Sequence, residues 1–232
     1  MPEFLILRLD GPMQAWGTHT FEDYRPASLF PTRSGLLGLI GACLGLERSD
    51  AESLRALGDS LSFAVRADQA ALRPGDRPPM PKGATKALDF HTVLNARKVD
   101  RSANRNPVVS RREYLFDAAF TVAVGFRPEA SFGFERVAAA LRRPYFTPVL
   151  GRRSCPLARP LLDRDTPVEA ADGLGALSQI PPGCGLVYAE SIADGGRVLQ
   201  IRDVPSYGRM RQFETRRLSL HHTDVPEGEG SS

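Results

Sequence analysis

The feature that most constrains the fold is the apolar segment at 30–46, FPTRSGLLGLIGACLGL. A helix is expected to begin here, because Pro31 stiffens the entry and a Thr32 or Ser34 hydroxyl can accept from an unpaired backbone N–H. Four glycines recur in it at spacings of three and four, which gives this helix a bare ridge opposite its leucines. Each glycine costs roughly 1 kcal/mol relative to alanine, so the ridge indicates that another backbone comes close.

Two interpretations of this segment remain open from its residues alone. The first is tight packing of a core helix on a sheet. The second is a nucleic-acid or nucleotide phosphate seated at the helix start. Arg33 stands at that start, where unpaired N–H groups and the positive end of the helix dipole favour an anion.

Composition describes an ordinary globular chain. With 232 residues, 42% of them hydrophobic and 25% charged, it can bury a core as one large or two small domains. The scattered Cys43, Cys155 and Cys184 show no CxxC pair and no His/Cys cluster, so no disulfide and no metal are expected. The charged start is unlike a signal peptide, and residues 36–46 are too few to span a bilayer, so a cytoplasmic protein without membrane contact is expected.

Positive charge is concentrated rather than large. The net charge is only +3, but six Lys/Arg stand against two acids at 91–113, six Arg against one acid at 142–164, and five Arg against two acids at 202–217. Arginine outnumbers lysine in these stretches, as expected where flat bidentate phosphate contacts matter.

The order of the expected elements predicts an α+β fold. The alternation of apolar and polar residues and the turn residues predict strands at 3–10, 60–67, 116–126 and 184–190 and helices at 30–46, 51–57 and 132–141. This order is most of a ferredoxin-like (RRM-like) βαββαβ domain, with 184–190 as the candidate for its final strand. A long hairpin at 89–94 and 108–116 is an inserted β-hairpin thumb, and a further hairpin at 197–202 and 212–221 makes the C-terminal part β-rich.

Domain limits follow from this order. An RRM-like domain is expected at 1–145, with the thumb inserted at about 82–113. A glycine-rich-loop and hairpin region at 146–223 completes the fold. The proline-rich connector at 73–83 breaks regular structure, and the polar tail at 224–232 is expected to be disordered.

Signatures of catalysis are absent from the sequence. There is no GxSxG, no HExxH and no complete Walker or Rossmann fingerprint, and no cofactor is expected. A lone histidine is usually structural or solvated, and this applies to His19, His91 and the pair His221 and His222.

The basic elements favour RNA as the ligand. A ferredoxin-like sheet is a common platform for single-stranded RNA, although the RNP1 pattern of a standard RNA-recognition motif is missing. In the loop GRRSCP at 151–156, glycine lets the backbone approach a ligand while two arginines and a serine supply donors. The alternative for this loop is a solvated turn. The hairpin thumb also carries basic residues, Arg97, Lys98, Arg101 and Arg105, for which the alternative is a merely soluble tip.

Five segments together resemble a known family: LILRLDGPMQAWG (5–17), FPTRSGLLGLIGACLGL (30–46), DFHTVLNAR (89–97), REYLFDAAFTVA (112–123) and YFTPVLGRRSCPL (145–157). They look like the CasD family, the fifth-family Cas (RAMP superfamily) subunits of the type I-E CRISPR surveillance complex Cascade. The resemblance implies a non-catalytic subunit that grips the repeat-derived 5′ handle of the CRISPR RNA. It also implies contacts with the large subunit CasA and the backbone subunit CasC, only indirect contact with target DNA, and repeat cleavage by a different subunit, CasE.

Charge, loop position and the resemblance together give a set of candidate RNA contacts. Arg33 is expected to hold a handle phosphate, with close approach allowed by glycine. Trp16 either stacks on a base or packs beneath the loop. The full set is Gln14, Trp16, Thr32, Arg33, Ser34, Gly35, Gly38, His91, Asn95, Arg97, Arg111, Arg112, Gly151, Arg152, Arg153 and Ser154.

Two other function classes are alternatives to this role. A related subfamily of subtype I-C cuts repeat RNA without a metal, through attack of a ribose 2′-OH, and His91, Lys86 and Tyr114 are the residues from which such a site would be assembled here. The other class is a protein–protein adaptor whose arginines bind acidic partners.

Overall fold

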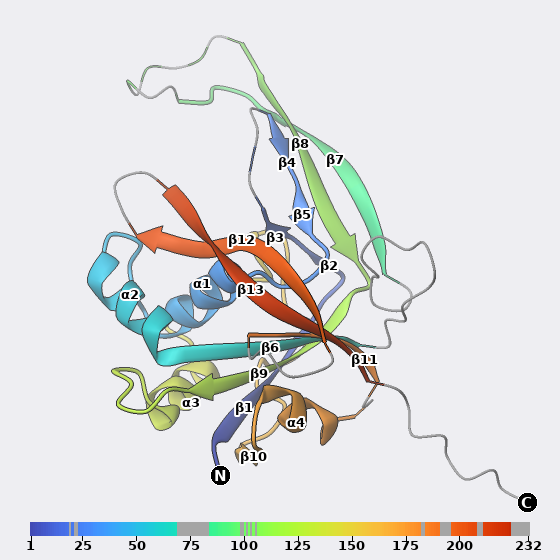
Figure 1. Cartoon of the computed structure of the whole chain (residues 1–232). Helices are drawn as coiled ribbons and strands as arrows, with labels where there is room; N and C mark the ends of the chain where they lie inside the picture. Colours follow the sequence, from blue (N-terminus) through green and yellow to red (C-terminus); the bar gives the residue numbers. More distant parts are fainter. Residues whose placement is uncertain are drawn as a thin grey trace, which may run out of the picture.

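In the computed structural model of the chain, residues 1–18, 20, 23–68, 84–97, 100, 102, 104, 106–181, 184–190, 196–207 and 211–223 are described. The connector expected at 73–83 and the tail expected at 224–232 lie outside them, as does His19. A seven-stranded sheet organises the fold, in the order β10-β1-β9-β6-β11-β13-β12 (Figure 1). Its strands and the helices are β1 (Glu3–Asp10), α1 (Arg33–Cys43), α2 (Ala51–Ser60), β6 (Leu61–Asp68), β9 (Ala119–Phe126), α3 (Phe134–Arg142), β10 (Val168–Glu169), α4 (Gly173–Ser178), β11 (Gly185–Ala189), β12 (Arg197–Tyr207) and β13 (Arg211–Thr223).

The sheet contains the expected ferredoxin-like unit, but a different strand completes it. In a βαββαβ unit the last strand lies beside the first. Here the short β10 does so, pairing Glu3 with Glu169 and Phe4 with Val168. Residues 184–190 do contain a strand, β11, but it pairs with β6 on the other side of the sheet. The expectation that 184–190 closes the unit was therefore wrong, because a two-residue strand leaves almost no periodic pattern.

Both faces of the sheet are buried. Along β1, Leu5, Leu7 and Leu9 face a core formed with α1, α2 and α3, whereas Phe4 and Ile6 face a second core under α4. This explains the nearly continuous apolar run of β1, since a strand covered on both faces needs no polar side. None of the described helices is long and apolar enough to cross a membrane.

Helix α1 is shorter than the apolar segment that encodes it. Thr32 is its N-cap and accepts from the N–H of Gly35. The helix ends at Cys43 in a Schellman motif, in which the Leu46 N–H donates to Gly41 O and the Gly45 N–H to Ala42 O. Gly45 has φ +75, which explains one of the four glycines by backbone conformation.

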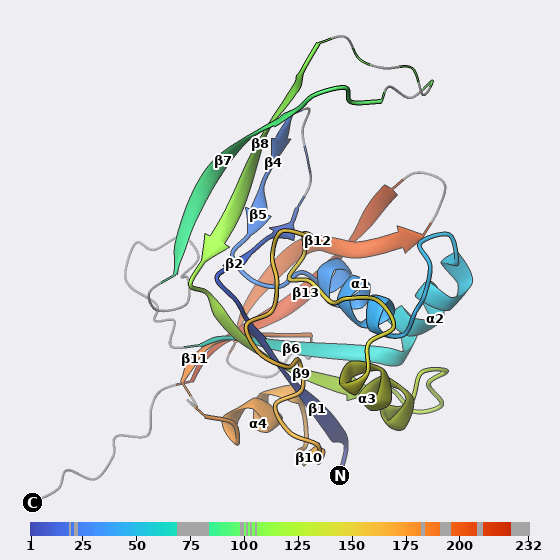
Figure 2. The ribbon, with the colours of Figure 1, turned by 180° about the vertical axis from the view of Figure 1, so that it is seen from behind.

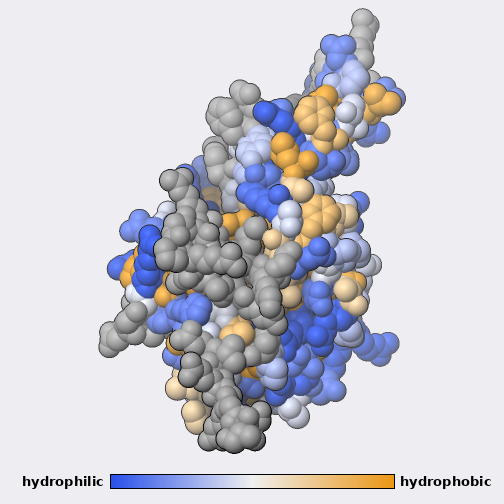
Figure 3. Space-filling model, turned by 90° about the vertical axis from the view of Figure 1, so that its right-hand side faces the viewer, coloured by the Kyte–Doolittle hydropathy of each residue, from blue (hydrophilic) through white to orange (hydrophobic). Residues whose placement is uncertain are grey.

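The expected thumb is confirmed as the hairpin of β7 (Thr85–Val93) and β8 (Val108–Phe116), which projects away from the main sheet (Figure 1). The predicted strand at 116–126 is β9, which begins only at Ala119 because the chain turns at Asp117 (φ 53) after β8. Two short strands, β2 (Met13–Gln14) and β4 (Tyr24–Arg25), flank β8 at the thumb root. Figure 3 shows hydrophobic side chains along the thumb; those exposed include Leu88, Phe90 and Leu94.

The C-terminal hairpin of β12 and β13 belongs to the main sheet and is longer than expected. It passes over α1 in Figure 1, and its register shifts between Arg202 and Val204. This irregularity lies at Asp203, whose side chain is buried. Because residues of both expected domains share one sheet, the division near residue 145 stays a proposal.

Candidate nucleic-acid interface

A cavity of about 410 Å³ lies where α1, the start of the chain and the loop after α3 meet; we call it the loop-side cavity. Figure 2 shows the segment after α3 running past α1 toward β2. Next to the cavity, β3 (Trp16–Gly17) pairs with β5 (Ala27–Ser28). The residues that line it are Ala15, Trp16, Gly17, Thr18, Thr20, Arg25, Pro26, Thr32, Ser34, Gly35, Gly38, Leu39, Ala42, Thr147, Val149, Gly151 and Arg152.

The loop at 150–155 is held rigidly against the start of the chain. Leu150 O accepts from the Ala15 N–H at 3.0 Å, and Leu150 N donates to Cys155 O at 2.8 Å. Gly151 has φ +92, and a Cβ on it would lie 2.0 Å from Ala15 O. The close backbone approach expected at Gly151 is thus made to Ala15 of the same chain, and this contact alone accounts for the glycine.

Arg152 joins the loop to the thumb root. Its guanidinium donates to Glu113 O and to Arg25 O, each at 3.1 Å, and lies 4.7 Å from the centre of the Tyr114 ring. These contacts connect the loop to β8 and β4. Arg152 lines the cavity, but much of its hydrogen-bonding capacity is used within the protein.

Arg153 and Ser154 are exposed on the same loop. Arg153 forms no hydrogen bond or ion pair with any residue that the structure describes. The Ser154 hydroxyl lies 3.5 Å from the Tyr114 hydroxyl. Of the arginine pair in this loop, Arg153 is therefore the one whose guanidinium remains available to a ligand.

Arg33 is buried, which corrects the expectation that it holds a phosphate. Its guanidinium pairs with Glu190 and donates to Gly58 O at 2.6 Å and Leu61 O at 3.1 Å. Only 8% of its side chain is exposed. The physical reason is that a buried arginine must satisfy its donors internally, and residues distant in the sequence supply the acceptors.

The anion position at the start of α1 is also occupied. The Arg33 N–H donates to Asp203 Oδ2 at 2.7 Å, and Asp203 is 3% exposed. The same carboxylate receives two hydrogen bonds from Arg216, at 2.6 and 2.7 Å. A carboxylate from the C-terminal hairpin thus takes the place that the sequence assigned to a phosphate.

Gln14 and Trp16 are core residues. Both are 0% exposed. Gln14 Nε2 donates to Leu9 O at 3.0 Å and Ala118 O at 2.6 Å, and its Oε1 accepts from the Trp16 indole at 2.9 Å. A Cβ on Gly35 would lie 2.7 Å from the Trp16 ring. Trp16 therefore packs beneath the loop instead of stacking on a base, and Gly35 makes room for it.

Gly38 is the glycine of α1 that internal packing does not explain. It is exposed in the middle of α1, and a Cβ on it would meet nothing within 4 Å. Together with Thr32 and Ser34 it lines the cavity, although Thr32 itself is only 2% exposed.

The thumb residues fall into two groups. Arg111 and Arg112 lie at the root, where they pair in register with Tyr24 and Arg25 of β4. Arg111 bonds to Asp23 at 3.2 Å, and Arg112 donates to Ser110 Oγ at 3.0 Å. Further out lie three exposed residues that do not line the loop-side cavity: His91, Asn95 and Arg97.

Two functional candidates were missed from the sequence. Arg25 lines the cavity, and Glu113 gathers the surrounding polar groups: it accepts from the Tyr24 hydroxyl, the Ala27 N–H at 2.9 Å and Lys86 at 2.5 Å. Burial raises the pKa of Glu113, but these bonds outweigh it and hold the pKa below its usual range. Arg25 was visible as the only Lys/Arg in the polar loop at 18–29, whereas the role of Glu113 depends on contacts between distant segments.

Comparison with known proteins places these observations in a family. The family described as CRISPR-associated protein (Cas_Cas5) matches residues 4–219. The CRISPR system Cascade subunit CasD of Escherichia coli (strain K12) is 45% identical over 218 residues, which are 93% of this chain and 94% of that protein.

Solved structures agree with this assignment. A chain of a structure described as "CRISPR RNA-guided surveillance complex" superposes with a TM-score of 0.74 at 30% identity, covering 97% of this chain and 91% of its own. A second, described as "Crystal structure of Cas protein", has a TM-score of 0.59 at 25% identity and covers 96% and 95%.

Proposed function

We propose, from the premise that the chain belongs to the Cas5 family of CRISPR-associated proteins, that it is a non-catalytic RNA-binding subunit of a type I-E Cascade complex. In this role it grips the repeat-derived 5′ handle of the CRISPR RNA. Its protein partners are the large subunit CasA and the backbone subunit CasC, and target DNA is contacted only indirectly. The 45% identity to a Cascade subunit over nearly the whole chain supports this role.

The observation that carries the proposal is the meeting of three elements at the loop-side cavity. The exposed face of α1 provides Ser34 and Gly38 as a floor without long side chains. The loop at 150–155 lines it with Gly151 and Arg152 and exposes the next two residues, Arg153 and Ser154. The thumb root brings Arg25. Positively charged donors around a narrow floor suit the backbone of a single RNA strand.

Five of the expected residues support this surface from inside the protein: Gln14, Trp16, Arg33, Gly35 and Gly151. We assign RNA contacts to Ser34, Gly38, Arg25 and Arg152 at the cavity and to the exposed Arg153 and Ser154 on the same loop as Arg152. Thr32 is 2% exposed and serves as the N-cap of α1, so it joins the supporting residues. The thumb residues His91, Asn95, Arg97, Arg111 and Arg112 bind the RNA as it leaves the cavity.

A non-catalytic role is supported by the geometry of the residues considered for cleavage. Tyr114 pairs in register with Ala87, so Lys86, the neighbour of Ala87, points to the opposite face of the thumb. His91 lies four positions beyond Ala87 along β7, a distance of about 13 Å, and pairs with Ser110. Lys86 is bonded to Glu113, and Tyr114 is 5% exposed. The three side chains do not converge on one point.

One incubation tests both parts of the proposal. The full chain is mixed, in EDTA, with a CRISPR RNA that carries its 5′ handle and with the same RNA lacking the handle. We expect tighter binding of the RNA with the handle and no cleavage. Equal affinity for the two RNAs would contradict handle recognition, and cleavage at one site in the repeat would contradict the non-catalytic role.

A further inference from the structure

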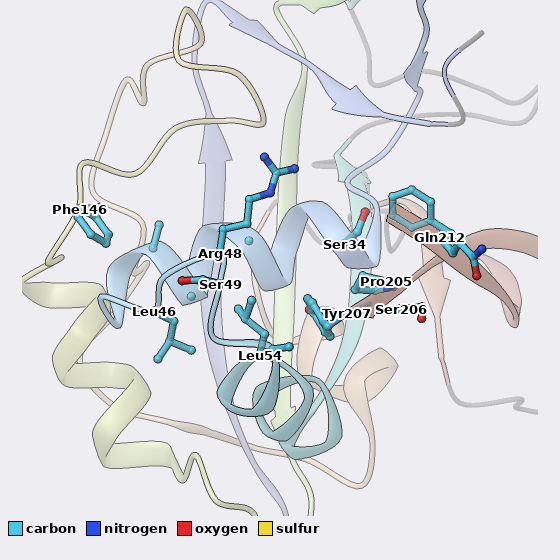
Figure 4. A pocket seen from close by; sticks show the side chains of 15 residues that line it. Ser34, Leu46, Arg48, Ser49, Leu54, Phe146, Pro205, Ser206, Tyr207 and Gln212 are labelled. Atoms are coloured by element: carbon cyan, nitrogen blue, oxygen red, sulfur yellow. The ribbon is translucent and has the colours of Figure 1, made fainter. Parts of the chain in front are cut away.

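A second cavity lies between α1 and the C-terminal hairpin. It measures about 950 Å³ and is formed by α1, the segment at 46–54, Phe146 and the hairpin of β12 and β13. Figure 4 shows α1 between Phe146 at one end and Gln212 at the other, with Leu46, Leu54 and Tyr207 along one side. We call it the hairpin-side cavity.

Its walls combine aromatic rings with unused polar groups. Phe146 is 43% exposed, and Tyr207 and Phe213 line the cavity from the hairpin. The side chains of Arg48 and Gln212 are exposed and form no hydrogen bond or ion pair with the described part of the chain. Flat apolar rings beside an amide and a guanidinium are the groups that proteins use to stack unpaired bases and to bond their edges.

The two cavities adjoin along α1. Ser34, Gly38 and Ala42 line both of them. At the middle of this shared floor stands Gly38, which has no side chain and open space around it. A strand with its phosphates on the loop side therefore reaches the hairpin side without crossing a side-chain barrier.

We propose that the hairpin-side cavity receives unstacked bases of the same RNA strand whose phosphates lie in the loop-side cavity. This inference rests on the proposed function and assigns the two cavities different parts of the ligand. The loop side holds backbone charge through arginines. The hairpin side holds bases, with Phe146 as the stacking ring and Gln212 as the group that bonds a base edge.

RNA is favoured over a protein segment because the cavity continues the surface assigned to RNA and shares its floor. A protein partner would need no open passage over Gly38, since it would enter from the hairpin side alone. The two occupants also predict different effects of a substitution in the cavity. If RNA is the occupant, the substitution weakens RNA binding; if a protein is the occupant, it impairs assembly with the other subunits.

The test uses the full chain and a labelled oligoribonucleotide with the 5′-handle sequence of its CRISPR RNA. Phe146→Ala is expected to weaken binding about tenfold, the loss typical of one stacked base. The slope of log K against log salt should stay as in the wild type, because no phosphate contact is removed. Gly38→Met, which fills the passage, should weaken binding at least as much without lowering the melting temperature.

A matched change in the RNA sharpens the test. Single abasic nucleotides are placed through the handle in turn. At the seated base, the abasic RNA should lose about tenfold in wild-type binding, and Phe146→Ala should then cause no further loss. Val198→Ala on β12 is the control, since Val198 is 42% exposed and lines neither cavity.

The failures of the two proposals are distinguishable. If the wild type binds handle RNA while Phe146→Ala and Gly38→Met bind it equally well, the base cavity is wrong and the RNA-binding function stands. If these variants bind RNA normally but fail to assemble with the other subunits, the cavity belongs to a protein and the inference is overturned. If the wild type does not prefer handle RNA, both proposals fail.

Discussion

The backbone N–H of Arg33 donates to Asp203 Oδ2 at 2.7 Å, although the two residues are 170 positions apart. This bond places a carboxylate of the C-terminal hairpin at the positive end of α1, which stabilises both. The Arg33 and Arg216 side chains both bind Glu190, and Arg216 also binds Asp203, so these four charged residues form one buried network. Helix α1, which lines both cavities, is therefore held in place by the hairpin of β12 and β13, which lines the hairpin-side cavity.

Asp203→Asn should destabilise the fold strongly. It removes the charge that compensates Arg216 and the N-terminus of α1, and breaking one side of a buried ion pair costs about 3–5 kcal/mol. Urea unfolding followed by circular dichroism gives this difference. The control is Asp165→Asn. The Asp165 side chain is 85% exposed and its partner Arg142 is also exposed, so this substitution should lower the free energy of unfolding by no more than about 1 kcal/mol. Similar small losses in both variants would contradict the network.

Gly151→Ala should also lower the free energy of unfolding. Its φ of +92 disfavours any residue with a side chain by about 1–2 kcal/mol, and the new Cβ would lie 2.0 Å from Ala15 O. Gly38→Ala is the matched comparison, because its Cβ meets nothing within 4 Å, and it should stabilise the helix by about 1 kcal/mol. The two variants are compared in the same thermal or urea unfolding series. Equal effects of the two changes would show that the loop is not held as described.

Arg152→Lys should loosen the thumb root. Lysine keeps the charge but cannot donate to Glu113 O and Arg25 O together or stack as a flat group on Tyr114. We expect faster amide exchange in β8 near Glu113 and β4 near Arg25. Arg153→Lys, on the exposed neighbour, should leave those exchange rates unchanged. Unchanged exchange in Arg152→Lys would mean that the thumb is held by its strand pairing alone.

Acid should weaken the fold partly through Asp163. Burial raises the pKa of this carboxyl, but hydrogen bonds and charges from Arg8 and Arg164 outweigh burial and hold the pKa below its ordinary value of 3.8. An acid with a lowered folded pKa stabilises the fold above its unfolded value, and this stability is lost as pH falls through the folded value. Unfolding free energies measured downward from pH 3.8 should therefore fall more steeply in the wild type than in Asp163→Asn. Parallel curves would assign the acid sensitivity to other groups.

Local patterns in the sequence were enough to predict most of the fold. The alternating residues of β7, β8, β12 and β13 indicated both hairpins, and the Thr32 cap located the start of α1. The order of strands in the sheet was harder. β10 has two residues, and its pairing with β1 depends on contacts across more than 160 positions, which no local pattern records.

The candidate site was predicted less completely for a related reason. An arginine in a sequence shows where a positive charge lies in the chain. It does not show whether the side chain will be buried in an ion pair with a carboxylate. Arg33 forms an ion pair with Glu190 and is buried, whereas Arg153, which also precedes a serine, is exposed. Of the three glycines in α1 itself, Gly35 and Gly41 face packed side chains, and only Gly38 is open. Position in the folded chain, and not residue type, separates the supporting residues from those available to RNA.

The central claim, that phosphates of the RNA lie in the loop-side cavity, is tested most directly by the salt dependence of handle-RNA binding. The full chain is titrated with the RNA over a series of salt concentrations, beside the double variant Arg25→Ala/Arg153→Ala and the control Arg197→Ala, an exposed arginine outside both cavities. Each lost phosphate contact with a single strand reduces the magnitude of the slope of log K against log salt by about 0.7. We therefore expect the double variant to have a slope about 1.4 smaller in magnitude than that of the wild type, and the control to have an unchanged slope. Equal slopes in the wild type and the double variant would contradict the claim.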